Sequence, residues 1–309
     1  MRQILFTIPI FGGIKVFGYG TMLFLAFLAS TRLAAWISRR EKLNPEVIYD
    51  LTIWVFVGGL LGARLFYVIQ YWDESIHSFW DIFRVWKGGI VLYGSIMGGT
   101  AAFFLYWFIR RFPLRPTLDA IAPALVLGIA LGRVGCFLNG CCYGDLCENG
   151  WGVSFPPGSP PWFNQVTDEY NRPTDRLLPG VTPAMVVEAR RGRILPGAPW
   201  ARPVHPTQLY SAVDACVLMT LLLAYYPLRR RDGEVMALLM MIYPVTRFLI
   251  EYLRNDEAAF FASLTISQNI SVLIFLSGLA YWFRLSRWPA ERYADRQEDA
   301  PHPNQLQAV

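Results

Sequence analysis

The stretch GRVGCFLNGCCYG, residues 132–144, places an arginine, an asparagine and three cysteines at the end of a long apolar run. Arg133 has no carboxylate one helical turn away that would neutralise it. A charge inside a membrane costs about 2.5–3.5 kcal/mol on insertion scales, so an arginine in such a run indicates a function. Because a guanidinium binds phosphate through two parallel hydrogen bonds, Arg133 predicts a phosphate-binding site near the level of the lipid headgroups.

Two further arginines and several polar side chains fall at the same depth of other apolar runs. Arg64 lies in GGLLGARLFYV and Arg247 in YPVTRFLIEY. Tyr243, Arg247 and Glu251 are four residues apart and therefore share one helix face. The other polar side chains at this depth are Tyr19, Tyr93, His205, Gln208 and Tyr210. Together these residues predict an anion-binding cavity to which several helices contribute.

Each of the charged residues other than Arg133 also has a simpler structural explanation. Arg247 and Glu251 are placed to form a pair that neutralises itself. Arg64 lies close enough to the end of its apolar run to extend its side chain to the membrane interface. The anion-binding cavity is favoured because polar residues from several spans fall at one depth of the membrane. Arg133 supports it most strongly, since no carboxylate lies one helical turn away.

The uncharged members have alternatives as well. Tyr19 and Tyr93 fit interfacial anchors when each is taken singly, and His205 fits a helix cap. Asp214, nearer the middle of the run that follows His205, is interpreted as a structural hydrogen-bonding group rather than a catalyst.

The chain that carries these residues has the composition of a membrane protein. Of its 309 residues, 54% are hydrophobic and 17% are charged. A helix needs about 20 mostly apolar residues to cross a bilayer, and backbone groups in lipid must satisfy one another, which favours helices. The predicted spans are residues 16–38, 47–70, 89–110, 117–140, 206–227, 234–253 and 266–284. Glycines that predict close helix approach are Gly58, Gly59, Gly62, Gly94, Gly98, Gly128 and Gly132.

The charges between the spans predict the orientation. SRREK at 38–42, RR at 110–111 and RRR at 229–231 fall in alternate loops, and the other loops are mixed or acidic. The positive-inside rule then places the N-terminus outside and the C-terminus inside. Basic residues in short loops give no indication of a nucleic-acid partner, so none is expected.

Two segments lie outside the spans. Residues 141–204 hold ten of the 21 prolines, with Trp151, Trp162 and Trp200, which suit a bilayer interface. This segment is predicted to be external, either as a covering loop or as a small head that receives a partner. Residues 288–309 are polar and are predicted to form a disordered cytoplasmic tail. The predicted fold is an all-α integral membrane bundle of seven helices, with one domain over residues 1–287.

Four of the five cysteines lie at or beyond the outer end of the fourth span: Cys136, Cys141, Cys142 and Cys147. An external compartment is oxidising, so a disulfide among them is the leading interpretation, ahead of free packing thiols. A zinc site is disfavoured because the spacing lacks two separated CxxC pairs, and no metal is predicted. Cys216, in the fifth span, is expected to be buried and alone.

Six stretches, in order along the chain, resemble the prolipoprotein diacylglyceryl transferase family. They are GYG at 18–20, GARLFYV at 62–68, FRVWKGGIVLYGSIMGG at 83–99, GRVGCFLNGCCYG at 132–144, HPTQLY at 205–210 and YPVTRFLIEYLRND at 243–256. The resemblance implies seven spans with the N-terminus outside, in a bacterial cytoplasmic (inner) membrane. It implies transfer of the diacylglyceryl group of phosphatidylglycerol to the lipobox cysteine of a prolipoprotein signal peptide, with release of glycerol 1-phosphate. No cofactor or metal is implied, and no oligomeric state is predicted.

The resemblance also assigns roles, at a site that faces the outer leaflet. Arg133 and Arg247 match the phosphate-handling arginines. Substrate-site positions fall on Tyr19, Arg64, Asn139, Gly144, Gln208, Tyr210, Tyr243 and Glu251.

The chain departs from the family pattern at three positions. Tyr93 stands where many members have a histidine that is proposed as the base, and Cys136 and Cys141 replace an asparagine and a glutamate. Tyrosine, with an ordinary pKa near 10, is a poor base at neutral pH. We therefore expect Tyr93 to position the substrate, and the thiol to be deprotonated by His205, by Glu251 or by the positive field.

Two other functions compete with the transferase. A transporter of anionic solutes requires polar groups along the whole crossing, whereas the cations within these spans gather in the predicted outer half. A catalytically altered, lipid-binding paralogue is favoured by the missing histidine.

Overall fold

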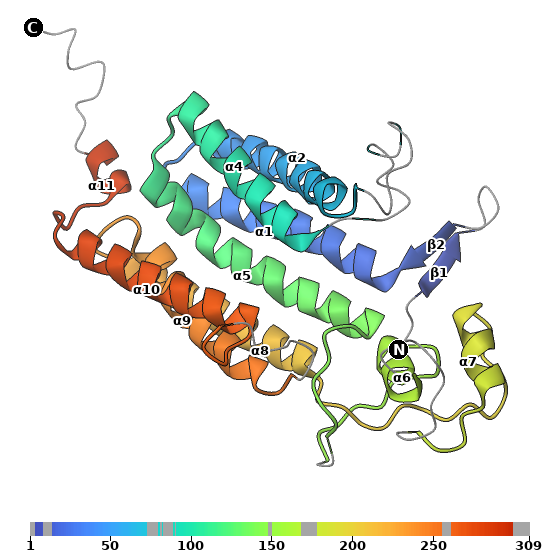
Figure 1. Cartoon of the computed structure of the whole chain (residues 1–309). Coiled ribbons are helices and arrows are strands. Elements are labelled where there is room, and N and C mark those ends of the chain that lie inside the picture. The colour runs from blue at the N-terminus through green and yellow to red at the C-terminus, as the bar shows by residue number, and fades with distance from the viewer. Residues whose placement is uncertain are drawn as a thin grey trace, which may run out of the picture. The chain divides into compact units, whose positions relative to one another are not determined.

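The computed structural model describes residues 4–8, 14–72, 80, 82, 89, 91–147, 150–167, 178–254 and 261–298, and its elements are shown in Figure 1. The strands are β1 (Ile4–Ile8) and β2 (Ile14–Phe17). The helices are α1 (Gly18–Arg40), α2 (Pro45–Gln70), α4 (Leu92–Arg110), α5 (Leu114–Asn139), α6 (Pro160–Val166), α7 (Pro183–Arg190), α8 (Thr207–Tyr225), the 3₁₀ helix η3 (Tyr226–Leu228), α9 (Glu234–Glu251), α10 (Ile266–Ser286) and α11 (Tyr293–Glu298).

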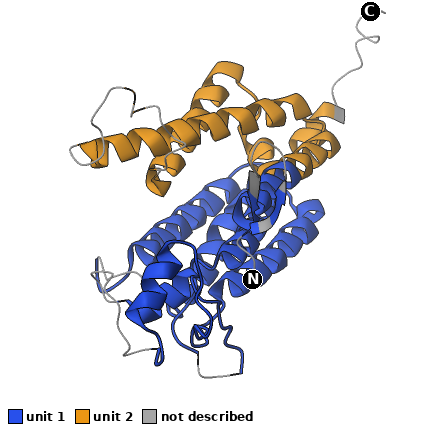
Figure 2. Cartoon of the chain, turned by 90° about the vertical axis from the view of Figure 1, so that its right-hand side faces the viewer, with its two compact units in different colours: residues 1–30, 122–289 blue, residues 31–121, 290–309 orange. Residues whose placement is uncertain are grey.

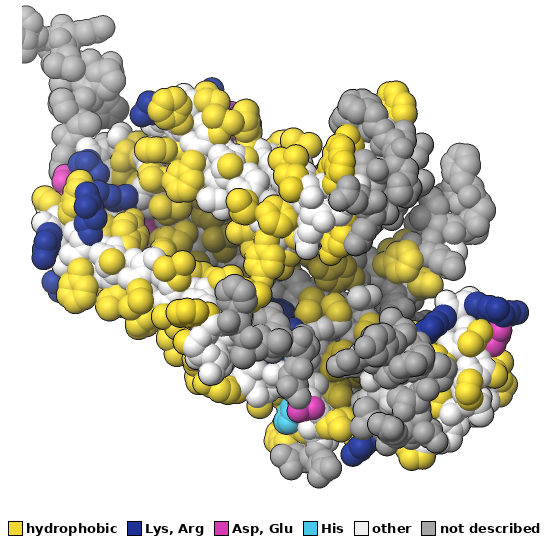
Figure 3. Space-filling model, viewed as in Figure 1, with side chains coloured by type: hydrophobic (Ala, Val, Ile, Leu, Met, Phe, Trp, Pro, Cys, Tyr) yellow, Lys and Arg dark blue, Asp and Glu magenta, His cyan; other side chains and the backbone are white. Residues whose placement is uncertain are grey.

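Six of the described helices are long and apolar enough to cross a membrane: α1, α2, α4, α5, α8 continued by η3, and α10. Large apolar side chains such as Leu61, Ile69 and Leu92 are exposed on them, and hydrophobic side chains cover much of the face seen in Figure 3. Apolar surface of this extent suits lipid rather than water. The prediction of a helical integral membrane protein is confirmed at this level.

The seventh predicted span coincides with α9, which is 18 residues long. This helix is not among the six, because it carries three charged residues: Glu234, Arg247 and Glu251. The count of seven spans and their orientation therefore remain predictions.

Two parts of the fold differ from what the sequence predicts. β1 and β2 pair antiparallel, with Ile8 opposite Ile14, and β-branched residues in both segments favour strands. In the tail that is predicted to be disordered, residues 293–298 form α11. Arg292 donates hydrogen bonds of 2.7 and 2.9 Å to Asp295 in its first turn. The disorder prediction is wrong for this stretch, and residues 299–309 lie outside the described residues.

The chain divides into two compact units (Figure 2). Unit 1 comprises residues 1–30 and 122–289, and unit 2 comprises residues 31–121 and 290–309. In unit 2, α2 and α4 pack backbone to backbone: a Cβ on Gly62 would overlap the Gly94 carbonyl oxygen, and a Cβ on Gly98 would overlap the Gly58 carbonyl oxygen. The predicted close approach is confirmed for this helix pair. Gly132, in α5, has no described atom within 4 Å of such a Cβ.

In unit 1, the proline-rich segment that follows α5 builds a core of its own. Phe155, Trp162 and Val166 are fully buried there together with Val186 of α7. Trp162 donates a 2.9 Å hydrogen bond to the Pro199 carbonyl oxygen, so it is a core residue rather than an interfacial anchor. Trp151 and Trp200 are exposed, which is compatible with the interfacial position predicted for them.

Candidate functional site

Most of the predicted site residues lie in unit 1, on three elements whose ends are hydrogen-bonded to one another. These are the C-terminal end of α5 with the loop 140–147 after it, the N-terminal end of α8, and the C-terminal end of α9. Gly144 N donates to the His205 carbonyl (2.8 Å), His205 N to the Asp145 carbonyl (2.9 Å), and Asp145 N to the Leu253 carbonyl (3.0 Å). These bonds join the three chain segments at one place.

Gly144 is required by this junction. A Cβ at this position would lie 2.5 Å from the Leu253 carbonyl oxygen and 2.8 Å from the Cβ of His205. Such distances leave no room for a side chain. Close passage of the neighbouring chain segments therefore explains the glycine at position 144, and its substrate-site role stays a prediction.

The HPTQLY motif holds the loop through two buried side chains. Thr207 Oγ1 donates a 2.8 Å hydrogen bond to the Cys142 carbonyl oxygen, and Gln208 Nε2 donates a 2.7 Å bond to the Cys141 carbonyl oxygen. Gln208 is fully buried, and its Oε1 has no hydrogen-bond partner among the described residues. Gln208, predicted to contact substrate, is placed to position the loop instead.

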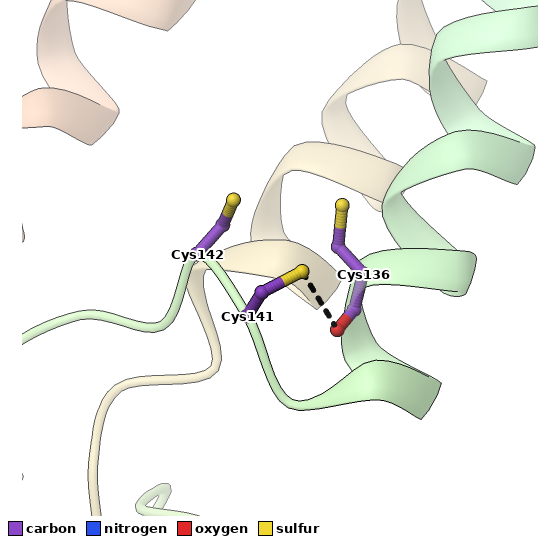
Figure 4. Close-up of side chains that lie close together, drawn as sticks. All are labelled: Cys136, Cys141 and Cys142. Carbon is purple, nitrogen blue, oxygen red and sulfur yellow. Dashed lines mark hydrogen bonds between the residues drawn. The ribbon is translucent and has the colours of Figure 1, made fainter. Parts of the chain in front are cut away.

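Three thiols meet inside this loop (Figure 4). The sulfur atoms of Cys136, Cys141 and Cys142 all lie within 4.8 Å of one another. Cys136 comes from the last turns of α5, and Cys141 N returns a 3.1 Å hydrogen bond to its carbonyl oxygen. Cys142 adopts a left-handed backbone conformation, φ +58°, which is uncommon for a residue other than glycine.

None of the five cysteines is joined to another by a disulfide in this structure, and the disulfide among the four outer cysteines stays a prediction. Cys147 is buried and lies outside the group of three. Cys216 is exposed on α8, so the expectation that it is buried was wrong. The thiols of Cys136 and Cys141 hydrogen-bond to the Cys142 sulfur and lower the pKa of the Cys142 thiol, with Arg254 and Arg133 acting in the same direction. The cations and the thiols therefore belong to one site.

Arg133 is a half-buried cation one turn before Cys136 on α5. No hydrogen bond or ion pair joins it to any residue in the described part of the chain. Arg254 was missed by sequence reasoning, although it lies one helical turn beyond Glu251 and is another basic residue at the same end of α9. Two cations thus act on the thiol loop.

Arg247 differs from Arg133 because its charge is already paired. Its Nη1 forms an ion pair with Glu251, and its Nη2 donates a 3.1 Å hydrogen bond to Ser267 Oγ. Glu251 is buried, and its Oε1 has no hydrogen-bond partner among the described residues. The simpler explanation of this pair, self-neutralisation, is confirmed as the arrangement present.

The neighbours on α8 and α9 have structural contacts. Thr246 Oγ1 donates a 2.8 Å hydrogen bond to Asp214, which confirms Asp214 as a hydrogen-bonding group, and a 3.0 Å bond to the Tyr243 carbonyl. His205 Nδ1 lies 3.4 Å from the Tyr210 hydroxyl, so the histidine ring of the motif contacts the tyrosine that follows it.

Tyr19 and Asn139 lie on the α5 side of the site. The ring of Tyr19, from α1, passes 3.2 Å from where a Cβ of Gly135 would lie. Tyr19 is also within electrostatic range of Arg133 and Cys136. Asn139, the last residue of α5, hydrogen-bonds the Cys141 thiol. Both residues are therefore neighbours of the thiol loop.

Arg64 and Tyr93 belong to unit 2. Arg64 is buried and donates 2.9 Å hydrogen bonds to the carbonyls of Ile82 and Gly89. Its guanidinium also lies 5.1 Å above the Tyr67 ring. Arg64 therefore fastens the segment that leads into α4 and does not extend to the interface. Tyr93, in the first turn of α4, is exposed.

Comparison with known proteins adds an independent line of argument. The family model described as prolipoprotein diacylglyceryl transferase matches residues 3–284. The chain is 31% identical to the phosphatidylglycerol–prolipoprotein diacylglyceryl transferase of Rhodopirellula baltica, over 89% of this chain and 73% of the relative. It is 30% identical to the protein of the same name from Clostridium tetani, over 93% and 99%. It is also 31% identical to the protein of this name from Gloeobacter violaceus, over 92% of this chain and 93% of the relative.

Proposed function

The chain belongs to the prolipoprotein diacylglyceryl transferase family, and from that premise we propose that it is the transferase of lipoprotein maturation. It moves the diacylglyceryl group of phosphatidylglycerol to the lipobox cysteine thiol of a prolipoprotein and releases glycerol 1-phosphate. The observation that carries the proposal is the family match over nearly the whole chain, to relatives that share this name.

The chemistry makes two demands on the site. The substrate thiolate attacks the glyceryl carbon that bears the phosphate ester, an S–C bond forms, and the C–O bond breaks with its electron pair on the leaving phosphate. That charge must be stabilised where it develops, which preorganised cations in a dry site do well. The thiol must also lose its proton, because its ordinary pKa is about 8.5.

Arg133 meets the first demand. It is half-buried, it has no hydrogen bond or ion pair within the described residues, and its five N–H donors are the geometric match for phosphate oxygens. Arg247 supplies a second cation, whose bonds to Glu251 and Ser267 involve two of its three guanidinium nitrogens. We assign the phosphate to Arg133 first and to the open donors of Arg247 second.

His205 and Glu251 are the candidate bases. The Oε1 atom of Glu251 is buried and has no hydrogen-bond partner in the described structure, so it can accept a proton. The Nδ1 atom of the His205 ring lies 3.4 Å from the Tyr210 hydroxyl, and a histidine is the side chain that most often serves as a general base. Tyr93 is assigned to substrate positioning.

The topology completes the proposal. Seven helices, the six apolar ones and α9, cross the bacterial cytoplasmic membrane with the N-terminus outside and the C-terminus inside. The basic last turns of α1, α4 and α10 support this orientation through the positive-inside rule. The site then faces the outer leaflet, where phosphatidylglycerol and the prolipoprotein signal peptide both reach it from the bilayer.

A catalytically altered paralogue that binds lipid is the second candidate, because Tyr93 replaces the histidine of many relatives. Expression of this chain in a bacterium depleted of its own transferase decides between them, with the mass of a reporter prolipoprotein as the readout. We expect growth rescue and a mass increase of one diacylglyceryl group. A chain that inserts correctly but adds no lipid would defeat the transferase proposal and leave the paralogue.

A further inference from the structure

We propose that Cys136, Cys141 and Cys142 form a binding site for a thiophilic divalent metal ion of the Zn²⁺ class, with one coordination position left open. The family match assigns no such site. The sequence spacing argued against zinc because it lacks separated CxxC pairs. The fold removes that objection, because the loop after α5 turns back and places Cys141 and Cys142 beside Cys136 in the last turns of α5.

The distances fit a metal better than a bridge. The three sulfur atoms lie within 4.8 Å of one another, and none is bonded to another. A Zn–S bond is about 2.3 Å long, so two sulfurs of a tetrahedral site lie about 3.8 Å apart. Each sulfur–sulfur distance therefore has to shorten by about 1 Å or less to reach that spacing.

The backbone around the thiols is fastened from outside the loop. Thr207 and Gln208 hold the carbonyl oxygens of Cys142 and Cys141, at 2.8 and 2.7 Å. These two donors belong to α8, and both are buried. Ligand positions held by a second layer of hydrogen bonds are typical of metal sites.

The charges of the thiolates and of the nearby arginines also favour a thiophilic divalent metal ion. Soft thiolates select Zn²⁺ or Cu(I) over hard cations such as Mg²⁺. Three thiolates around a divalent ion carry a net charge of −1, and Arg133 and Arg254 lie within electrostatic range of Cys142 to offset it.

The number of ligands indicates an open position. Among the described residues, the group contains no further His, Cys, Asp or Glu beside the three cysteines. Zinc sites that only support structure have four protein ligands, whereas catalytic ones have three and an open position. Three protein ligands from the described residues would leave the fourth position to an external ligand.

The substrate thiol is the chemical match for that position, and this step rests on the proposed function. A thiol bound to a divalent metal is deprotonated outright. Cys136, Cys141 and Cys142 would hold the ion, which would supply Lewis-acid activation of the substrate thiol, and His205 would accept the thiol proton. The substrate sulfur would then form its bond to the glyceryl carbon as the C–O bond to phosphate breaks with its electron pair on the leaving group. Such activation replaces much of the task of the histidine that Tyr93 displaces.

Metal binding is tested without any lipid transfer. The full-length chain, purified in detergent under reducing conditions without chelator, is loaded with Zn²⁺ and its metal content measured by elemental mass spectrometry. We expect about one Zn²⁺ per chain, and affinity lowered at least about 10-fold in Cys136→Ser, Cys141→Ser and Cys142→Ser. The control Cys216→Ser changes an exposed thiol outside the group and should bind as the wild type does.

Cd²⁺ provides a readout that does not depend on the variants folding. Its thiolate-to-metal absorption and X-ray absorption spectrum on the wild-type chain should report three sulfur ligands. Absence of bound metal in the reduced wild type, or metal retained when all three cysteines are changed to serine, would overturn the site.

The open position is tested by transfer. We expect a chelated enzyme to lose at least about 10-fold of its transfer rate at neutral pH and to regain it with Zn²⁺. Full activity of the metal-free enzyme would overturn the assignment of substrate thiol to the metal. A chain that binds Zn²⁺ through the three cysteines but never transfers lipid supports the metal site and defeats only the proposed function.

Discussion

The side-chain amide of Gln208 donates a 2.7 Å hydrogen bond to the carbonyl oxygen of Cys141. The donor is the second residue of α8 and the acceptor lies in the loop after α5, so this one bond connects elements 67 residues apart in the chain. Two backbone junctions, those of Gly144 with His205 and of Asp145 with Leu253, fasten the same loop. The thiols, the cations and the α8 motif are thereby held in one piece of unit 1.

Substituting Gln208 with leucine tests whether this bond positions the loop. Leucine fills similar space but leaves the buried Cys141 carbonyl without its donor, which costs about 1–2 kcal/mol of unfolding free energy. We expect a lower thermal midpoint and faster alkylation of Cys141 and Cys142, measured by mass spectrometry. Thr220→Val, which removes an exposed hydroxyl bond on the same helix, is the matched control. Alkylation rates equal to those of the wild type would contradict the positioning role.

Arg133 is expected to act mainly in the transfer step. Arg133→Gln removes the charge that faces the leaving phosphate, and loss of one such group lowers the rate by about 10²- to 10³-fold. Arg133→Lys restores charge but not the bidentate geometry, so an intermediate rate is expected. Initial rates with phosphatidylglycerol vesicles measure both. Arg191→Gln removes an exposed ion pair with Glu188 and should leave the rate unchanged. A wild-type rate in Arg133→Gln would remove this residue from the mechanism.

The spans could be predicted from the sequence because lipid imposes length and apolarity on a helix. The observed α2 ends and α10 begins at the predicted residue, and the other bounds of α2, α5 and α10 differ from the predicted ones by a few residues at most. The β1–β2 hairpin and α11 were missed because their segments are too short to form the long apolar run by which a membrane span is recognised. Local preferences for strand and helix decide such segments.

The site was predictable as a set of residues but not as a set of contacts. Charge in an apolar run identified Arg133 and Arg247, yet only the structure shows that the first has no hydrogen bond or ion pair among the described residues while the second is paired with Glu251. Arg64 carries the same signal and turns out to bind backbone carbonyls of Ile82 and Gly89. The grouping of three thiols was not predictable, because compartment and spacing do not determine how close thiols are arranged in a turn.

The Arg247–Glu251 pair allows structural and catalytic roles to be separated. Glu251→Gln leaves Arg247 with an uncompensated, largely buried charge, and we expect a loss of about 3–5 kcal/mol in unfolding free energy. The double variant Arg247→Met, Glu251→Leu removes both charges, which is often neutral for stability. We expect it to recover the thermal midpoint without recovering transfer. Recovery of transfer in the double variant would show that the pair is purely structural.

His205 and Tyr93 are expected to divide the tasks of proton transfer and positioning. His205→Ala should lower transfer by about 10²- to 10⁴-fold, the range for loss of a general base. Tyr93→Phe, which keeps the ring and removes the hydroxyl, should cost less than about 10-fold because a hydrogen bond is worth about 1 kcal/mol. Rates are measured with a lipobox peptide, and thermal unfolding confirms that both variants fold. The opposite order of effects would refute this division.

The packing of α2 against α4 gives a prediction about stability alone. An alanine at Gly62 places its Cβ onto the Gly94 carbonyl oxygen, a backbone atom that cannot move aside like the end of a side chain. Overpacking of this kind costs about 1–3 kcal/mol, so we expect Gly62→Ala to lower the thermal midpoint in detergent. Gly132→Ala is the matched control: it lies within α5, meets no described atom within 4 Å, and gains helix propensity of about 1 kcal/mol. We therefore expect the two glycine-to-alanine changes to shift the midpoint in opposite directions, and equal shifts would contradict the backbone contact between α2 and α4.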